Sequence, residues 1–122
     1  MDIYREEILE HYKYPHNFGD LSGKTHSAKG VNASCGDMVE VYLKIKGSVI
    51  IEAAFRGVGC AVSTAAASML TEELKGKTVM EVKSWGDSKM FELLGEVNPG
   101  RMKCVRLPLA IFQEAADSKL VE

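Results

Sequence analysis

Two neighbouring runs of alternating apolar and polar residues constrain the fold more than any other feature of the sequence. In residues 39–45, and again in residues 49–55, every second side chain is apolar. Successive side chains of a β-strand point to opposite faces, so each run predicts a strand with one buried face. Gly47 lies between the runs and marks a turn, so together the runs predict an antiparallel hairpin.

The length of the hairpin loop decides which side chains share a face of the sheet. A two-residue loop would place Ile45 opposite Ile50, out of phase with the apolar positions of the second strand. A three-residue loop, residues 46–48, would pair Ile45 with Val49 and align the two apolar faces. We therefore expect the three-residue loop, with Ile51 on the buried face.

The N-terminal third of the chain contains one helical pattern and one weak strand. Residues 2–14 place Ile8, Leu9 and Tyr12 at helical spacing, which predicts an amphipathic N-terminal helix. The following stretch is rich in Gly, His, Asn, Ser and Lys and has no apolar period, so it predicts a loop. This loop leads into a weak edge strand near residues 26–32.

Helical patterns dominate the second half of the chain. A long helix is predicted from Cys60 to Gly76. Shorter helices are predicted over residues 79–85 and 90–94. A last helix carries apolar side chains at helical spacing beyond residue 104. Proline is tolerated in the first turn of a helix, where backbone N–H groups lack partners, so Pro108 should lie there. Cys104 would then lie at or just before the start of this helix.

These elements predict an α+β fold, in which a small antiparallel sheet of about three strands is covered on one face by helices. The chain has 122 residues, close to the usual size of one compact domain. Its hydrophobic content of 46% is enough for a core without disulfide bonds. We therefore expect a single domain over residues 1–122.

The charge and the N-terminal sequence exclude several classes of partner and location. A net charge of -2 gives no general electrostatic attraction to nucleic acid or to an anionic membrane, so neither is an expected partner. No apolar run approaches the length that spans a bilayer. The N-terminal segment has neither the apolar core of a signal peptide nor the Arg-rich, acid-poor character of a transit peptide, which favours a cytoplasmic location.

Three cysteines are the residues most suited to chemistry. They cannot all pair with one another, and a reducing cytoplasm would keep them as thiols, so packing, metal binding and reactivity all remain open as roles. Cys35 precedes Gly36 in a tight turn, and Cys60 and Cys104 adjoin predicted helix N-termini, which stabilise thiolates. Lys103 adds a neighbouring cation to Cys104. No C-x-x-C spacing occurs, so spacing alone does not identify a metal site.

Four ordered motifs resemble the IscU/NifU-type iron-sulfur scaffold family. They are H-Y-K-Y-P-H-N-F-G at residues 11–19, N-A-S-C-G-D at 32–37, G-V-G-C-A-V-S at 57–63 and R-M-K-C at 101–104. The resemblance runs nearly end to end. It implies the same arrangement of a sheet and helices, and a protein that holds and transfers its cargo rather than an enzyme.

The resemblance implies a site made by Cys35, Cys60 and Cys104 together with Asp37. Soft thiolates suit the iron of a two-iron, two-sulfur cluster, and a carboxylate would be a weaker fourth ligand that favours release. Asp37 has an alternative role as a turn cap that accepts hydrogen bonds from local N–H groups. Cys104 beside Lys103 is our choice for the first acceptor of persulfide sulfur.

The resemblance also implies partners. A cysteine desulfurase would deliver persulfide sulfur, an electron donor such as ferredoxin would supply electrons, and apo iron-sulfur proteins would receive the cluster. A homodimer is a candidate assembly, and the N-terminal helix is a candidate docking surface.

The third cysteine motif departs from the IscU branch of the family. Lys103 stands where many relatives have a His, and the R-x-K-C form is similar to the SufU branch, whose members bind zinc and relay sulfur. That branch usually has an insertion between the second and third cysteines, for which the interval from Cys60 to Cys104 is too short. The main hypothesis is therefore the scaffold. The alternatives are a zinc-binding sulfur acceptor and a structural zinc-binding module, both with the same ligands.

The histidines lie in the N-terminal region and have no paired metal-ligand spacing. They are His11, His16 and His26. We expect solvated or structural roles for them rather than metal binding.

Overall fold

The predicted hairpin forms two strands of a three-stranded antiparallel sheet in the computed structural model of the chain, which describes residues 3–33 and 36–118. The strands are β1 (His26–Asn32), β2 (Asp37–Lys46) and β3 (Val49–Val58), and β2 lies between the other two. The weak edge strand predicted near residues 26–32 is therefore confirmed as β1.

The hairpin loop is shorter than expected. The last residue of β2, Lys46, pairs with the first residue of β3, Val49, so two residues connect the strands. The expected three-residue loop, with Ile45 opposite Val49, is wrong. Gly47 has a φ of 66°, in the left-handed region that the favoured two-residue hairpin turns require.

A β-bulge in β3 corrects the phase that the short loop creates. Ile45 pairs with Ile50 while Lys44 pairs with Glu52, so Ile51 is an extra residue on β3. Ile50 is fully buried, and it takes the core position that the sequence suggested for the half-buried Ile51. Beyond the bulge the apolar side chains of the two strands face each other again on the core side of the sheet. These are Val41 opposite Phe55 and Leu43 opposite Ala53.

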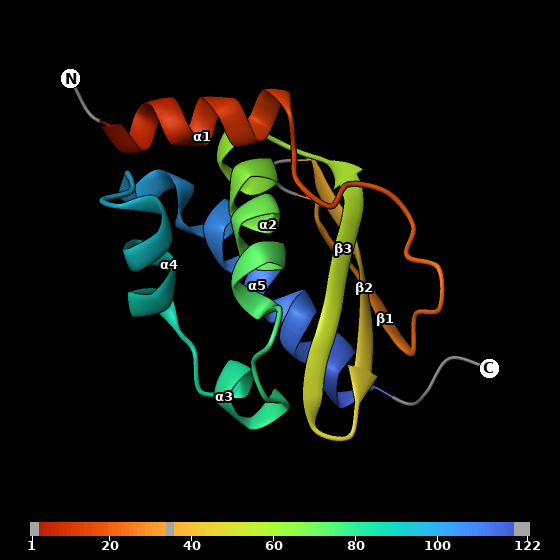
Figure 1. Cartoon of the computed structure of the whole chain (residues 1–122). Helices are drawn as coiled ribbons and strands as arrows, with labels where there is room; N and C mark the ends of the chain where they lie inside the picture. Colours follow the sequence, from red (N-terminus) through yellow and green to blue (C-terminus); the bar gives the residue numbers. More distant parts are fainter. Residues whose placement is uncertain (1–2, 34–35, 119–122) are drawn as a thin grey trace.

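Helices cover one face of the sheet, as predicted for an α+β fold (Figure 1). They are α1 (Ile3–Lys13), α2 (Ala61–Leu74), α3 (Val79–Lys83), α4 (Asp87–Leu94), the short 3-10 helix η1 (Pro99–Arg101) and α5 (Met102–Asp117). Helix α2 packs against β3, and α5 packs against β1 and β2. None of the helices in the described part of the chain is long and apolar enough to cross a membrane.

Helix α5 begins earlier than expected. It starts at Met102, so Pro108 lies inside the helix and not in its first turn. Proline has no N–H, so residue 108 cannot donate the usual helical hydrogen bond to the carbonyl of Cys104. The ring of Pro108 is buried in the interface between α5 and the rest of the protein, which offsets part of that cost. Cys104 therefore lies within the first turn of α5.

The N-terminal helix α1 is present, but its buried face differs from the sequence expectation. Ile8 packs against the core, whereas Leu9 and Tyr12 are each 46% exposed. His11 is buried instead, and it faces α2. The segment after α1 then covers the edge of β3, where Phe55 exchanges backbone hydrogen bonds with residues 17 and 19.

Candidate metal centre

Three segments that are far apart in the sequence bring one Asp and two Cys side chains together. Asp37 is the first residue of β2, Cys60 is the N-cap of α2, and Cys104 lies in the first turn of α5. One ligand atom from each residue lies within 4.8 Å of the other two. The structure thus gathers these three predicted ligands at one point. Cys35, the fourth predicted ligand, lies outside the described residues, two positions before Asp37 in the chain.

Cys60 caps the N-terminus of α2. Its Sγ accepts a hydrogen bond from the backbone N–H of Ser63 at 3.4 Å, as Ser or Thr oxygen does in an ordinary N-cap. The positive end of the helix dipole lies beside this sulfur. Cys60 is half-buried, so its sulfur is held in place by the helix without being sealed from solvent.

Asp37 links the start of β2 to the start of α2. Its side chain is 1% exposed, and Oδ1 accepts a hydrogen bond from the backbone N–H of Cys60 at 3.1 Å. This contact joins residues that are 23 positions apart in the chain. The carboxylate is therefore buried at the centre and helps to hold the start of α2 against the start of β2.

Two glycines allow the backbone around the centre to pack closely. A Cβ atom on Gly59 would lie 2.8 Å from Oδ1 of Asp37, and a Cβ atom on Gly57 would lie 2.0 Å from the carbonyl oxygen of Met38. Both distances are shorter than a van der Waals contact permits. The glycines before Cys60 are thus required by close approach, as their position in the sequence suggested.

Cys104 differs from its predicted environment. Its side chain is only 3% exposed, although the neighbouring Lys103 is exposed. Burial, together with hydrogen bonds and negative charge from Cys60 and Asp37, raises the pKa of the Cys104 thiol to about 12. The expectation that the helix start and Lys103 favour the thiolate of Cys104 is therefore wrong for the metal-free centre. A bound cation would reverse this balance, because a coordinating thiol is deprotonated.

An open hollow of about 510 Å³ gives access to this part of the molecule. It is lined by η1 and the first turn of α5, including Lys103, Cys104 and Arg106. Three cationic side chains line this hollow together with the buried Cys104, and they are Arg101, Lys103 and Arg106.

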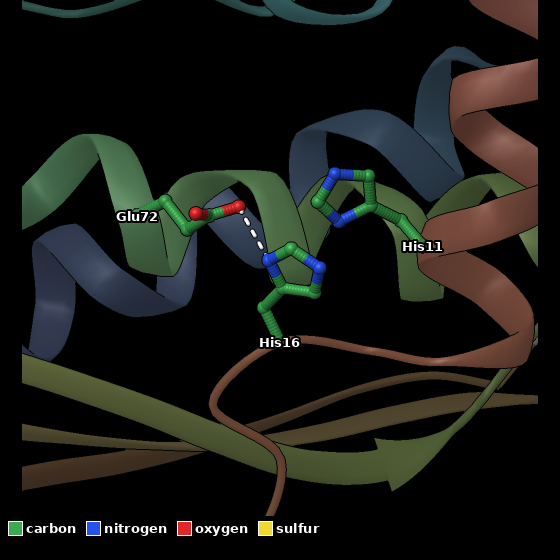
Figure 2. A group of neighbouring side chains, drawn as sticks. All are labelled: His11, His16 and Glu72. Atoms are coloured by element: carbon green, nitrogen blue, oxygen red, sulfur yellow. Dashed lines mark hydrogen bonds and ion pairs between the residues drawn. The ribbon is translucent and has the colours of Figure 1, made fainter.

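A second group of side chains with metal-ligating atoms shares no residue with the cysteine centre (Figure 2). It consists of His11, His16 and Glu72, a combination that no pattern in the sequence indicated. Glu72 is 56 residues from His16 in the chain, so no local spacing could have connected them.

The chain matches one described protein family and is similar in sequence to named relatives. The family described as NifU-like N terminal domain matches residues 3–118. The zinc-dependent sulfurtransferase SufU of Bacillus subtilis is 34% identical over 123 residues, covering 86% of this chain and 83% of that protein. The iron-sulfur cluster assembly scaffold protein IscU 1 of Archaeoglobus fulgidus is 34% identical over 113 residues, covering 93% of this chain and 74% of that protein.

A solved structure extends the similarity to three dimensions. It is that of a proposed iron-sulfur cluster assembly scaffold protein for the SUF system from Fervidobacterium islandicum AW-1. The two structures superpose with a TM-score of 0.78 at 28% sequence identity, covering 91% of this chain and 94% of the other.

Proposed function

The chain belongs to the family of NifU-like N-terminal domains, and from that premise we propose that it is a scaffold on which iron-sulfur clusters are assembled and from which they are transferred. The cluster is cargo in this proposal, so the protein holds and passes on a group and is not itself a catalyst. We further propose that the whole chain, residues 1–122, works as one domain.

The convergence of Asp37, Cys60 and Cys104 is the observation that carries this proposal. Two soft thiolates and one harder carboxylate are a donor set that suits iron in a cluster, with Cys35 as the proposed remaining ligand. Thiolate ligands hold the irons firmly, whereas the carboxylate exchanges more readily. The same centre can therefore bind a two-iron, two-sulfur cluster and later release it.

Sulfur would arrive as the persulfide of a cysteine desulfurase. We propose Cys104 as the first acceptor, because it lines the open hollow and has the exposed Lys103 beside it. Its thiolate would attack the outer sulfur of the desulfurase persulfide, form a new S–S bond and release the desulfurase cysteine as a thiolate. Since the thiol is buried, a cation bound at the centre would have to favour its deprotonation first.

Other partners are needed by the chemistry of the cargo. Iron enters separately, an electron donor such as ferredoxin supplies reducing equivalents, and apo iron-sulfur proteins receive the finished cluster. A homodimer remains a proposal as well, and analytical ultracentrifugation of the purified chain tests it.

A second function is favoured by one comparison. The relative in Bacillus subtilis is a zinc-dependent sulfurtransferase, and the same three or four ligands could hold a tetrahedral zinc ion. In that case the protein would accept sulfur and relay it without building a cluster.

Anaerobic reconstitution with iron and sulfide separates the two functions. The scaffold should turn reddish brown and contain iron and acid-labile sulfide in equal amounts, whereas a zinc form is colourless. A protein that retains zinc, takes up no iron and still accepts desulfurase sulfur would overturn the scaffold proposal in favour of the sulfur acceptor.

A further inference from the structure

His11, His16 and Glu72 come from three different segments and point toward one another (Figure 2). His11 projects from α1, His16 from the segment that follows it, and Glu72 from α2. One ligand atom from each lies within 4.8 Å of the other two. The two imidazole rings have their centroids 4.5 Å apart and are tilted by 41°.

A buried serine contacts the ring of His11 and the backbone of His16. Ser68 is fully buried in α2, one turn before Glu72, and its Oγ lies 2.6 Å from Nδ1 of His11. The same oxygen accepts a hydrogen bond from the backbone N–H of His16 at 2.7 Å. Histidines that bind metals usually have their other ring nitrogen fixed by a neighbouring polar group, as Ser68 does for His11.

The rest of the segment that carries His16 is also held in place. Nδ2 of Asn17 donates a hydrogen bond to Oγ1 of Thr71 at 2.9 Å, and the backbone of Asn17 accepts one from Phe55 at 3.0 Å. His16 is therefore attached on both sides, to α2 and to β3, while its ring remains half-exposed.

Glu72 supplies a negative charge that no Lys or Arg of the described part of the chain pairs with. Nδ1 of His16 donates to Oε1 of Glu72 at 2.7 Å, and among the described side chains Glu72 has no ion pair with Lys or Arg. The Glu72 side chain is 51% exposed and that of His16 is 47% exposed. Both can move apart slightly, and solvent can reach the space between them.

We propose that His11, His16 and Glu72 form a binding site for a divalent transition metal ion such as zinc, separate from the cysteine centre. Two imidazole nitrogens and one carboxylate oxygen are a donor set that suits zinc, and water from the open side completes a tetrahedron. Imidazole donors disfavour magnesium and calcium, which prefer oxygen ligands. This inference stands independently of the proposed function.

Binding requires only a local rearrangement. Ligand atoms around a tetrahedral zinc ion are roughly 3.3 Å apart, given zinc–nitrogen bonds of about 2.0 Å. The hydrogen bond between His16 and Glu72 would open by a fraction of an ångström, with the His16 proton moving to its other ring nitrogen. His11 would approach from the buried side. The ion would then connect α1 to α2, because one ligand comes from each helix and one from the segment between α1 and β1.

The site is remote from the cysteine centre. Glu72 lies 12 residues after Cys60, which corresponds to about 18 Å along a helix axis. The two sites share no residue, so each can be removed by mutation without touching the other.

Zinc titration followed by ¹H–¹³C spectra of the histidine rings tests this inference directly. The chain has three histidines, and His26 is an internal control because it lies in β1 outside the group. We expect the ring signals of His11 and His16 to move together and saturate, while those of His26 stay unchanged. The readout does not depend on the cysteine centre.

Variants sharpen the test. Glu72→Gln and His16→Asn should each weaken the zinc affinity measured from these ring signals by at least about tenfold. Glu73→Gln is the matched control, since Glu73 pairs with Lys89 instead, and it should leave the affinity unchanged. If His11 and His16 respond no more strongly than His26, or if Glu72→Gln binds zinc as tightly as Glu73→Gln does, the inference is wrong.

Discussion

Helix α2 contributes to two groups of candidate ligands that differ in burial and in chemistry. Near its N-terminus, Cys60 joins the buried Asp37 and Cys104, whose protonated thiol is stabilised by the interior. In its later turns, Ser68 and Glu72 join two imidazoles at a surface that is half-open to solvent. The first group needs a cation before it can ionise fully, whereas the second is already satisfied by hydrogen bonds. The two groups therefore differ in burial. The first is a buried centre proposed to hold a cluster, and the second is a half-exposed site proposed to hold a metal ion.

The largest effect is expected from substitutions that remove one cysteine of the first group and leave the second group intact. Cys60→Ala should lower the iron content after anaerobic reconstitution by at least about tenfold, because too few soft ligands remain for a bridged cluster. We expect the same of Cys35→Ala and Cys104→Ala. His16→Asn is the control and should bind the cluster normally. A Cys60→Ala protein with full iron occupancy and an unchanged visible spectrum would show that this cysteine is not a ligand.

Replacing Asp37 tests whether the buried carboxylate is both a structural group and a ligand. Asp37→Ala should lower the free energy of unfolding by about 1–3 kcal/mol, because it removes the acceptor for the N–H of Cys60. Asp37→Cys adds a soft ligand and should slow cluster transfer to apo-ferredoxin by roughly tenfold.

Urea unfolding and spectroscopic transfer assays measure these two effects. Equal transfer rates in the unmodified protein and both variants would remove Asp37 from the ligand set. If Asp37→Ala has the same free energy of unfolding as the unmodified protein, the Asp37 carboxylate does not stabilise the fold around the centre.

Alkylation rates compare the two described cysteines within the first group. In metal-free protein at pH 8, Cys60 should react several-fold faster than Cys104, because Cys104 is 3% exposed and burial raises its pKa to about 12. Lys103→Glu should change the Cys104 rate little, since the side chain of Lys103 is exposed. Mass-spectrometric labelling over time provides the rates. Faster labelling of Cys104 than of Cys60 would contradict this prediction and support the reactive Cys104 thiolate that the sequence suggested.

The smallest expected effect concerns the second group and pH. Burial, and to a lesser extent the charge of His16, lowers the pKa of His11 below 6.5, while Glu72, Glu7 and Glu10 oppose the shift. The folded protein then binds fewer protons than the unfolded chain, so stability is full above pH 6.5 and falls as the pH drops below that value.

Hydrogen exchange of α1 backbone amides at pH 7.5 and pH 5.5 measures this loss. The amides should exchange faster at the lower pH, after correction for intrinsic rates. His11→Gln should remove most of the difference, and an equal pH dependence in that variant would contradict the prediction.

Local sequence patterns determined most of the secondary structure. The alternation in residues 39–45 and 49–55 led to the hairpin, and helical periodicity led to α1, α2 and the helices that follow. Side-chain period is a property of neighbouring residues, so it can be read without knowledge of the fold. The cysteine motifs and Asp37 pointed to the centre through their resemblance to the iron-sulfur scaffold family, and the glycines beside Cys35 and Cys60 agreed with it.

Only the tertiary structure decided the features that depend on contacts between distant segments. The bulge at Ile51 exists because the core selects Ile50, and Pro108 is tolerated inside α5 because packing offsets its missing hydrogen bond. The burial of Cys104 reverses the thiolate preference that its helix position implied. The meeting of His16 with Glu72, 56 residues away, had no signature in the sequence, since only the packing of α1 and its following segment on α2 brings them together.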